Sequence, residues 1–163
     1  MQLNVNGVER EVESPLLAPL LVVLREELGI TSPKAGCQQG GCGACTVLVD
    51  GKTARSCLML AVQADGADVR TVEGLAAPDG SLHPLQQAFW DNHGLQCGFC
   101  TPGMLMSALE LLQQNPSPTE LEVREAIAGN ICRCTGYVFI VKSILAAAET
   151  MRAGAPTTAG AAR

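Results

Sequence analysis

Three cysteines, Cys37, Cys42 and Cys45, follow one another with the spacing C-x₄-C-x₂-C in a glycine-rich stretch. This is the spacing of the local ligands of a plant-type [2Fe–2S] cluster, whose set needs a fourth cysteine farther along the chain. Cys57 supplies that residue. A loop around a cluster has to turn tightly and aim backbone N–H groups at anionic sulfur, which glycine permits. We therefore expect Cys37, Cys42, Cys45 and Cys57 to bind one [2Fe–2S] cluster.

Four further cysteines form two pairs, Cys97 with Cys100 and Cys132 with Cys134. Two irons need two thiolates each, so four ligands from two loops suit a second [2Fe–2S] cluster. Cys100 lies beside a predicted helix N-terminus, whose dipole favours the thiolate. Structural zinc is the alternative, because paired C-x₂-C knuckles commonly bind zinc, although the second pair here is C-x-C. A thioredoxin-like role for Cys97 and Cys100 is less favoured, since no βαβ pattern surrounds them.

Composition narrows the class of protein. The chain has 163 residues, of which 47% are hydrophobic but only 3% aromatic, so inorganic cofactors are expected to help hold its small cores together. The net charge is −5 and there is no basic patch, which argues against nucleic acid as a partner. The N-terminus has no targeting signal, and the most apolar run, Leu16–Leu24, is too short for a transmembrane segment. We expect a cytoplasmic protein whose cysteines are metal ligands and not disulfides.

The first half of the chain reads as strands around one helix. Strands are expected at 2–5, 10–12, 46–49, 52–55 and 68–72. The dipeptides Asn6-Gly7 and Asp50-Gly51 mark hairpin turns. A helix is expected over Leu20–Leu28, with Gly29 as its C-terminal stop. This order predicts an α+β fold whose first domain, residues 1–75, is a ferredoxin-like domain of the β-grasp kind.

The second half reads as helical. After the turn-rich connector 76–81, helices are expected from Pro84, from Thr101 to Leu112, from Thr119 to about Ala128 and from about Tyr137 to Met151. Thr101 is expected to be an N-cap followed by Pro102, and Thr119 to form a capping box with Glu122. We predict a four-helix bundle over residues 76–152, followed by a disordered tail over residues 153–163.

Three stretches, in this order, resemble those of a known family: 35–47 (AGCQQGGCGACTV), 96–103 (QCGFCTPG) and 129–137 (GNICRCTGY). The chain is similar over residues 1–152 to the iron–sulfur small subunit of the xanthine oxidase family of molybdenum hydroxylases, of the carbon monoxide, aldehyde or N-heterocycle dehydrogenase type. The eight cysteine positions of the family are all filled. The short length without a fused flavin domain is more similar to the small subunits of the three-subunit enzymes than to the large fused enzymes.

The resemblance implies an electron-transfer subunit of an oxidoreductase, with no substrate site on this chain. It implies that the first cysteine set, Cys37, Cys42, Cys45 and Cys57, binds the cluster nearer the electron exit. It likewise implies that Cys97, Cys100, Cys132 and Cys134 bind the cluster near the molybdopterin of a large subunit, which Gln96 and Cys134 contact. Electrons would leave to FAD on a medium subunit, in a dimer of heterotrimers.

Two other functions stay open at this point. The acceptor could be a cytochrome in a two-subunit enzyme, or the chain could be a free-standing [2Fe–2S] ferredoxin, although a ferredoxin gives no reason for a second cysteine-bearing domain. The substrate of the holoenzyme, the reduction potentials and the subunit composition do not follow from this chain.

Overall fold

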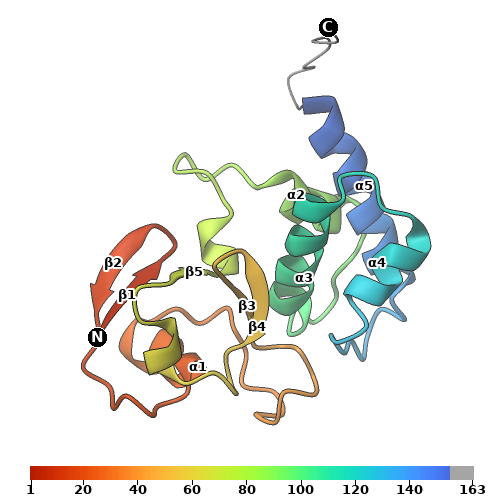
Figure 1. The fold of residues 1–163 in the computed structure, drawn as a ribbon. Helices are drawn as coiled ribbons and strands as arrows, with labels where there is room; N and C mark the ends of the chain where they lie inside the picture. Colours follow the sequence, from red (N-terminus) through yellow and green to blue (C-terminus); the bar gives the residue numbers. More distant parts are fainter. Residues whose placement is uncertain (155–163) are drawn as a thin grey trace, which may run out of the picture.

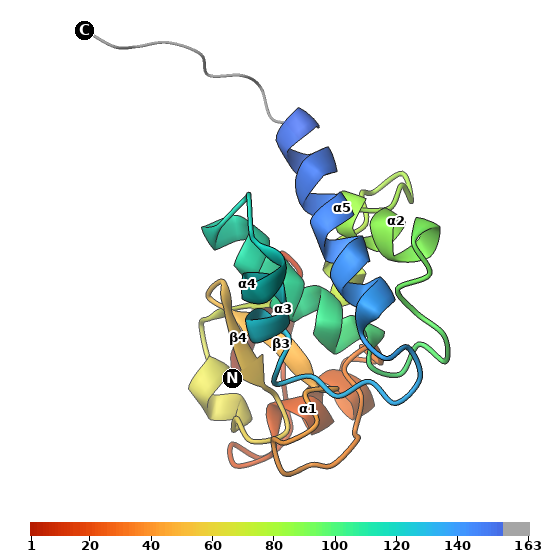
Figure 2. The same ribbon diagram turned by 90° about the vertical axis from the view of Figure 1, so that its right-hand side faces the viewer.

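The structure, a computed structural model, describes residues 1–154. A sheet lobe and a helical lobe lie side by side in Figure 1, and Figure 2 shows the same two lobes turned by 90°. The sheet lobe contains β1 (Gln2–Val5), β2 (Val8–Glu11), α1 (Leu20–Val22), η1 (Val23–Glu27), β3 (Thr46–Val49), β4 (Lys52–Arg55), η2 (Ala61–Ala64), β5 (Asp68–Arg70) and η3 (Val72–Gly74). The helical lobe contains α2 (Pro84–Asp91), α3 (Thr101–Gln114), α4 (Glu120–Ala126) and α5 (Val138–Gly154).

The five strands form one mixed sheet with the order β2-β1-β5-β3-β4. β1 pairs antiparallel with β2 and parallel with β5, and β3 pairs antiparallel with both β4 and β5. Both predicted hairpin turns are confirmed: Asn6 and Gly7 have φ of 54° and 78°, and Asp50 and Gly51 have φ of 49° and 77°. Two successive positive φ values match the right-handed twist of the flanking strands. The turns therefore fix the register of both hairpins.

The helix expected over Leu20–Leu28 is present but not regular. It begins as the α-helical turn α1 and continues with π-helical geometry through η1. Gly29 follows with φ of 67°, which confirms its role as the stop. The apolar side chains of this segment pack against the sheet in a core formed by Leu3, Val5, Val12, Leu20, Val23, Leu24, Val47, Ala61, Ala64 and Val69.

Strand β3 serves two cores, because successive side chains of a strand point to opposite faces. Val47 is buried in the core under α1 and η1, whereas Leu48 is buried in the core of the helical lobe. On that second face, α3 contacts β3 and β4 and also packs against α2 and α4. Helix α3 therefore joins the two lobes, and it begins directly after Cys100. No helix within residues 1–154 is both long and apolar enough to cross a membrane.

The start of α3 differs from the sequence prediction. Cys100, not Thr101, is the N-cap, and its φ of −81° and ψ of −17° are already helical. The Cys100 carbonyl accepts a hydrogen bond from Met104 N at 3.0 Å, so the helix begins one residue earlier than expected. Thr101 Oγ1 is buried and has no hydrogen-bond partner among the described residues. The predicted cap at Thr101 is therefore wrong, because the cysteine loop sets the backbone of Cys100.

Other elements begin or end within a few residues of the positions predicted from the sequence. The capping box of Thr119 and Glu122 is confirmed at the start of α4. β5 ends at Arg70, two residues earlier than expected, because η3 begins at Val72. Helix α5 continues through residues 153–154, which were expected in the tail. The rest of the predicted disordered tail, 155–163, lies outside the described residues.

Candidate metal centres

The loop between η1 and β3 presents backbone N–H groups to the first cysteine. The amides of Gln39 and Cys42 donate to Cys37 Sγ at 3.3 and 3.4 Å. These hydrogen bonds, the one from Gln39 foremost, lower the pKa of the Cys37 thiol to about 7. The loop is also tight, because a Cβ on Gly36 would lie 2.8 Å from Cys42 Sγ. The loop thus favours a thiolate, which is the form that binds iron.

The hairpin of β3 and β4 brings the segment that contains Cys57 back to Cys45. Its neighbour Ser56 donates through Oγ to the Cys45 carbonyl at 2.7 Å, which fastens the end of β4 to the start of β3. Cys45 is buried, and burial, with smaller contributions from Cys57 and Cys42, raises the pKa of its thiol to about 11. A buried thiol of this kind ionises when a cation compensates the charge. The hairpin thus places the residue before Cys57 against Cys45, and the assignment of Cys37, Cys42, Cys45 and Cys57 to one ligand set stays a prediction.

The second cysteine set is assembled from two loops of the helical lobe. Cys134 Sγ lies 3.5 Å from Cys97 Sγ, so the loop before α3 meets the loop before α5. Cys100 and Cys132 line the same cavity, and burial, with a smaller contribution from Cys132, raises the pKa of the Cys100 thiol to about 12. The Cys97–Cys134 pair takes one cysteine from each loop. Within residues 1–154, no three His, Cys, Asp or Glu side chains form a group around a single ion position.

Two residues of the stretch after Cys132 hold that cysteine in place. The Thr135 hydroxyl lies 3.2 Å from Cys132 Sγ, and the Thr135 amide donates to the same sulfur at 3.5 Å. Burial raises the pKa of the Cys132 thiol, but the hydrogen bonds from Thr135 outweigh it, and the net shift is downward. Tyr137 Oη accepts a hydrogen bond from the Cys132 amide at 2.9 Å. The roles of Thr135 and Tyr137 were not predicted from the sequence, although their place in the GNICRCTGY stretch could have indicated them.

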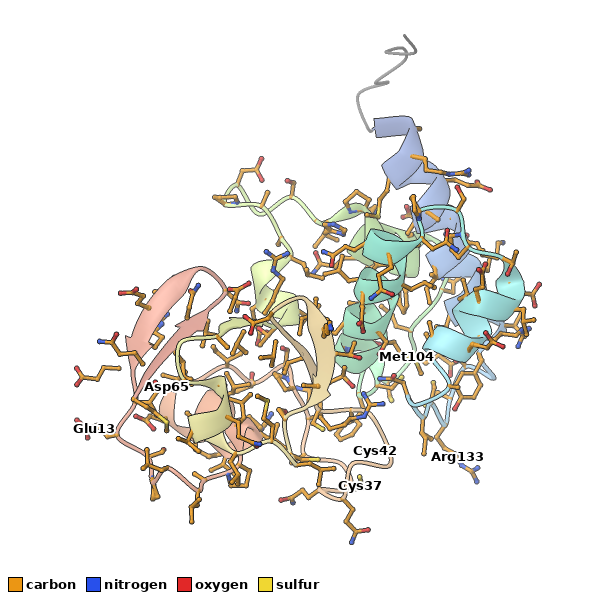
Figure 3. The ribbon with its side chains drawn as sticks, in the orientation of Figure 1. Glu13, Cys37, Cys42, Asp65, Met104 and Arg133 are labelled. Atoms are coloured by element: carbon orange, nitrogen blue, oxygen red, sulfur yellow. The ribbon has the colours of Figure 1, made fainter. Side chains whose placement is uncertain are left out.

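One cavity of about 150 Å³ is lined by all four cysteines of the second set and by Cys42 of the first set. Figure 3 shows Cys37 and Cys42 on the loop at the lower edge of the molecule, and Arg133 on the neighbouring loop of the helical lobe. The remaining lining residues are Gly36, Ala44, Phe99, Ile131 and Arg133. The fold therefore brings Cys42 of the first set next to the second set, although the two are far apart in the sequence.

The second set also reaches the surface. Cys97 and Cys134 are exposed, whereas Cys100 and Cys132 are buried. Gln96, which the sequence analysis selected as a cofactor contact, is exposed directly before Cys97. Two large apolar side chains border the same loops, with Phe99 47% exposed and Ile131 57% exposed. This edge combines an exposed sulfur pair, an amide and apolar surface.

The residues present fit two iron–sulfur clusters by their donor chemistry. Each set offers four cysteine sulfurs, and in each set backbone amides donate to at least one sulfur: Gln39 and Cys42 to Cys37, and Thr135 to Cys132. Donors of this kind stabilise the anionic sulfur of a cluster and tune its potential.

Comparison with known proteins gives two consecutive family matches. A family described as "2Fe-2S iron-sulfur cluster binding domain" matches residues 3–76. A second family, described as "[2Fe-2S] binding domain", matches residues 71–145. Each match contains one of the two cysteine sets. The chain therefore has two [2Fe–2S] domains, a first with a mixed sheet and a second made of helices.

Characterised relatives match over nearly the whole chain. The small subunit of nicotine 6-hydroxylase from Paenarthrobacter nicotinovorans is 54% identical over 145 residues, which cover 89% of this chain and 87% of the relative. Subunit gamma of caffeine dehydrogenase from Pseudomonas sp. strain CBB1 is 52% identical over 155 residues, 92% of this chain and 91% of the relative. Among solved structures, quinoline 2-oxidoreductase from Pseudomonas putida 86 has a chain with a TM-score of 0.90 and 48% identity, which covers 94% of this chain and 96% of that chain.

Proposed function

From the premise that this chain belongs to the iron–sulfur small subunits of the xanthine oxidase family of molybdenum hydroxylases, we propose that it relays electrons from a molybdopterin site on a large subunit to FAD on a medium subunit. As in that family, the chain is an oxidoreductase subunit without a substrate site of its own. In this proposal the sheet lobe is a β-grasp domain and the helices α2–α5 form a four-helix bundle.

Each lobe would hold one cluster with its own four cysteines. Cys37, Cys42, Cys45 and Cys57 are the ligands in the sheet lobe, and Cys97, Cys100, Cys132 and Cys134 are those in the helical lobe. A [2Fe–2S] cluster, when bound, supplies one-electron transfer. The chain itself contributes the thiolates and amide donors described above, and it buries Cys45, Cys100 and Cys132 away from solvent.

One observation supports the proposed direction of electron transfer, from the second cysteine set to the first. Cys97 and Cys134 of the second set lie at an exposed edge, while the whole set lines a cavity with Cys42 of the first set. Electrons that enter at the exposed edge can therefore pass to the sheet lobe without crossing solvent. Cys42 is the residue of the first set nearest to this passage, and we assign it the receiving position.

The exposed edge is also the proposed contact with the large subunit. Gln96 and Cys134 would meet the polar rim of the pterin, and Phe99 and Ile131 would be covered by the partner, since large apolar side chains gather in such interfaces. The whole enzyme would be a dimer of heterotrimers. Eight free cysteines fit a reducing compartment, and we place the enzyme in the cytoplasm.

Metal and sulfide analysis of the purified chain tests the proposal. Two clusters require about four irons and about four acid-labile sulfides per chain, because each cluster contains two of each. The protein should be brown-red, with zinc well below one equivalent. Stoichiometric zinc, or iron without sulfide, would contradict the assignment of the eight cysteines.

A further inference from the structure

A buried polar network joins the two lobes next to the cysteine loops. Asn130, which is 2% exposed, comes from the loop between α4 and α5. Its Nδ2 donates to the Gly43 carbonyl at 3.0 Å and to Thr46 Oγ1 at 3.3 Å, both in the sheet lobe. Its Oδ1 accepts a hydrogen bond from Ser107 Oγ of α3 at 2.8 Å. One amide thus binds the cysteine loop of the sheet lobe and the central helix at once.

The chemistry of the partners fixes the orientation of this amide. The Gly43 carbonyl can only accept, so the NH₂ end of Asn130 has to face it. Thr46 Oγ1 donates its own proton to the same carbonyl at 2.6 Å and accepts from Arg55 as well as from Asn130. Since every polar atom here has a partner, the loss of one donor leaves a buried acceptor unsatisfied.

The residues on either side of Asn130 also make hydrogen bonds to the sheet lobe through their backbone atoms. Ile131 N donates to the Cys42 carbonyl at 2.9 Å, and Arg55 donates to the Gly129 carbonyl at 2.7 Å. The first of these bonds links a cysteine of the first set to the residue that directly precedes Cys132 of the second set. The path between the two sets therefore runs through one hydrogen bond and a few covalent bonds, and Asn130 is adjacent to that bond in the chain.

Glycines let the lobes approach each other closely at this point. A Cβ on Gly103 of α3 would overlap the Gly43 carbonyl oxygen and would lie 2.9 Å from Asn130 Nδ2. Gly43 has φ of 73°, and a Cβ there would overlap the Gly129 carbonyl oxygen. The interface consequently has no room for a methyl group at either position.

We propose that Asn130 is a positioning residue that holds the Cys42 loop against the Cys132 loop and thereby sets the rate of electron transfer between the two centres. The inference rests on the proposed relay. Its physical basis is that Asn130 lies on the boundary between the lobes and binds Gly43 and Thr46, which flank the cysteine loop of the sheet lobe. The apolar contacts of α3 with β3 hold the two lobes together, and the network fixes how the two cysteine loops lie against each other.

The sharpest variant is Asn130→Asp, which keeps the volume and the acceptor for Ser107 but replaces the donor with an anionic oxygen that faces the Gly43 carbonyl. In the reduced chain, the magnetic interaction between the two paramagnetic centres should weaken, and electron transfer between them should slow. Hydrogen exchange of the Ile131 amide should accelerate by about tenfold or more, because a lost buried hydrogen bond shifts an opening equilibrium by that order. Iron content should be unchanged.

Gly103→Ala is an independent variant, because it adds a methyl group at the interface and removes no polar group. It should weaken the same magnetic interaction although alanine favours a helix more than glycine does. The matched controls are Asn115→Asp, which alters an amide bound to Glu122 at the far end of α3, and Gly154→Ala, where nothing lies within 4 Å of the added Cβ. Neither control should change the interaction between the centres.

The outcomes separate this inference from the proposed function. Two centres in the wild-type chain, with an interaction that Asn130→Asp and Gly103→Ala both leave unchanged, would overturn the role of Asn130 and leave the relay intact. A wild-type chain without two paramagnetic centres would overturn the relay, and the positioning role with it. A weakened interaction in both interface variants, with intact clusters and unaffected controls, supports the inference.

Discussion

Replacement of Gln96 by leucine tests the proposed contact with the pterin. Gln96 is exposed beside the exposed Cys97, so Gln96→Leu should change the stability of the isolated chain by no more than about 0.5 kcal/mol. In the holoenzyme, leucine would leave the polar rim of the cofactor unpaired in a buried interface, at a cost of about 1–3 kcal/mol. This corresponds to roughly 5-fold to 150-fold weaker retention of the cofactor or of the large subunit.

The assay compares holoenzyme co-purified with wild-type and Gln96→Leu chains. The molybdenum-to-iron ratio after gel filtration should fall in the variant, while the iron and sulfide per small subunit stay the same. Gln113→Leu is the matched control, since Gln113 is an exposed glutamine near the C-terminal end of α3, away from the cysteine loops. An unchanged molybdenum ratio and an unchanged rate of reduction by substrate would refute the contact of Gln96 with the cofactor.

Three further predictions concern other parts of the chain. Cys42→Ser should remove or distort only the EPR signal of the sheet-lobe cluster, because the helical lobe has its own four cysteines; loss of both signals from a folded protein would contradict the division into two sets. Burial raises the pKa of Glu73, but the hydrogen bonds from Ser32 and Thr71 outweigh it and hold that pKa below its ordinary value. Glu73→Gln should therefore destabilise the chain at pH 7, and this difference should disappear as the pH falls through the lowered pKa; a difference in urea unfolding that stays constant through the whole acid range would be inconsistent with it. Thr119→Ala should lower the free energy of unfolding by about 1 kcal/mol, because Glu122 N loses its acceptor, and a urea midpoint equal to that of the wild type would contradict this.

Features set by neighbouring residues could be predicted from the sequence. The turns at Asn6-Gly7 and Asp50-Gly51 and the capping box at Thr119 depend on conformational preferences within a few residues, and the structure has all three. The spacing of Cys37, Cys42 and Cys45 predicted a [2Fe–2S] domain in the first half of the chain, which the family match over residues 3–76 confirms, because cluster geometry restricts the loop length.

Features set by distant residues could not be predicted. The cap at Thr101 failed because the cysteine loop, through the bond of Thr101 N to the Gly98 carbonyl, already gives Cys100 a helical conformation. No role for Asn130 could be predicted, because its partner Gly43 is 87 residues away and the sequence gives no sign of that contact.

A reductive titration of the purified chain, followed by EPR with spin quantitation, tests the central claim most directly. The claim predicts two distinct signals, each of which integrates to about one spin per chain, because each lobe would hold one [2Fe–2S] cluster that accepts a single electron. The two signals should appear at separate potentials, since the sulfur environments of Cys37 and Cys132 differ. A single signal across the whole titration, or a colourless protein that takes up no electrons, would contradict a relay through this chain.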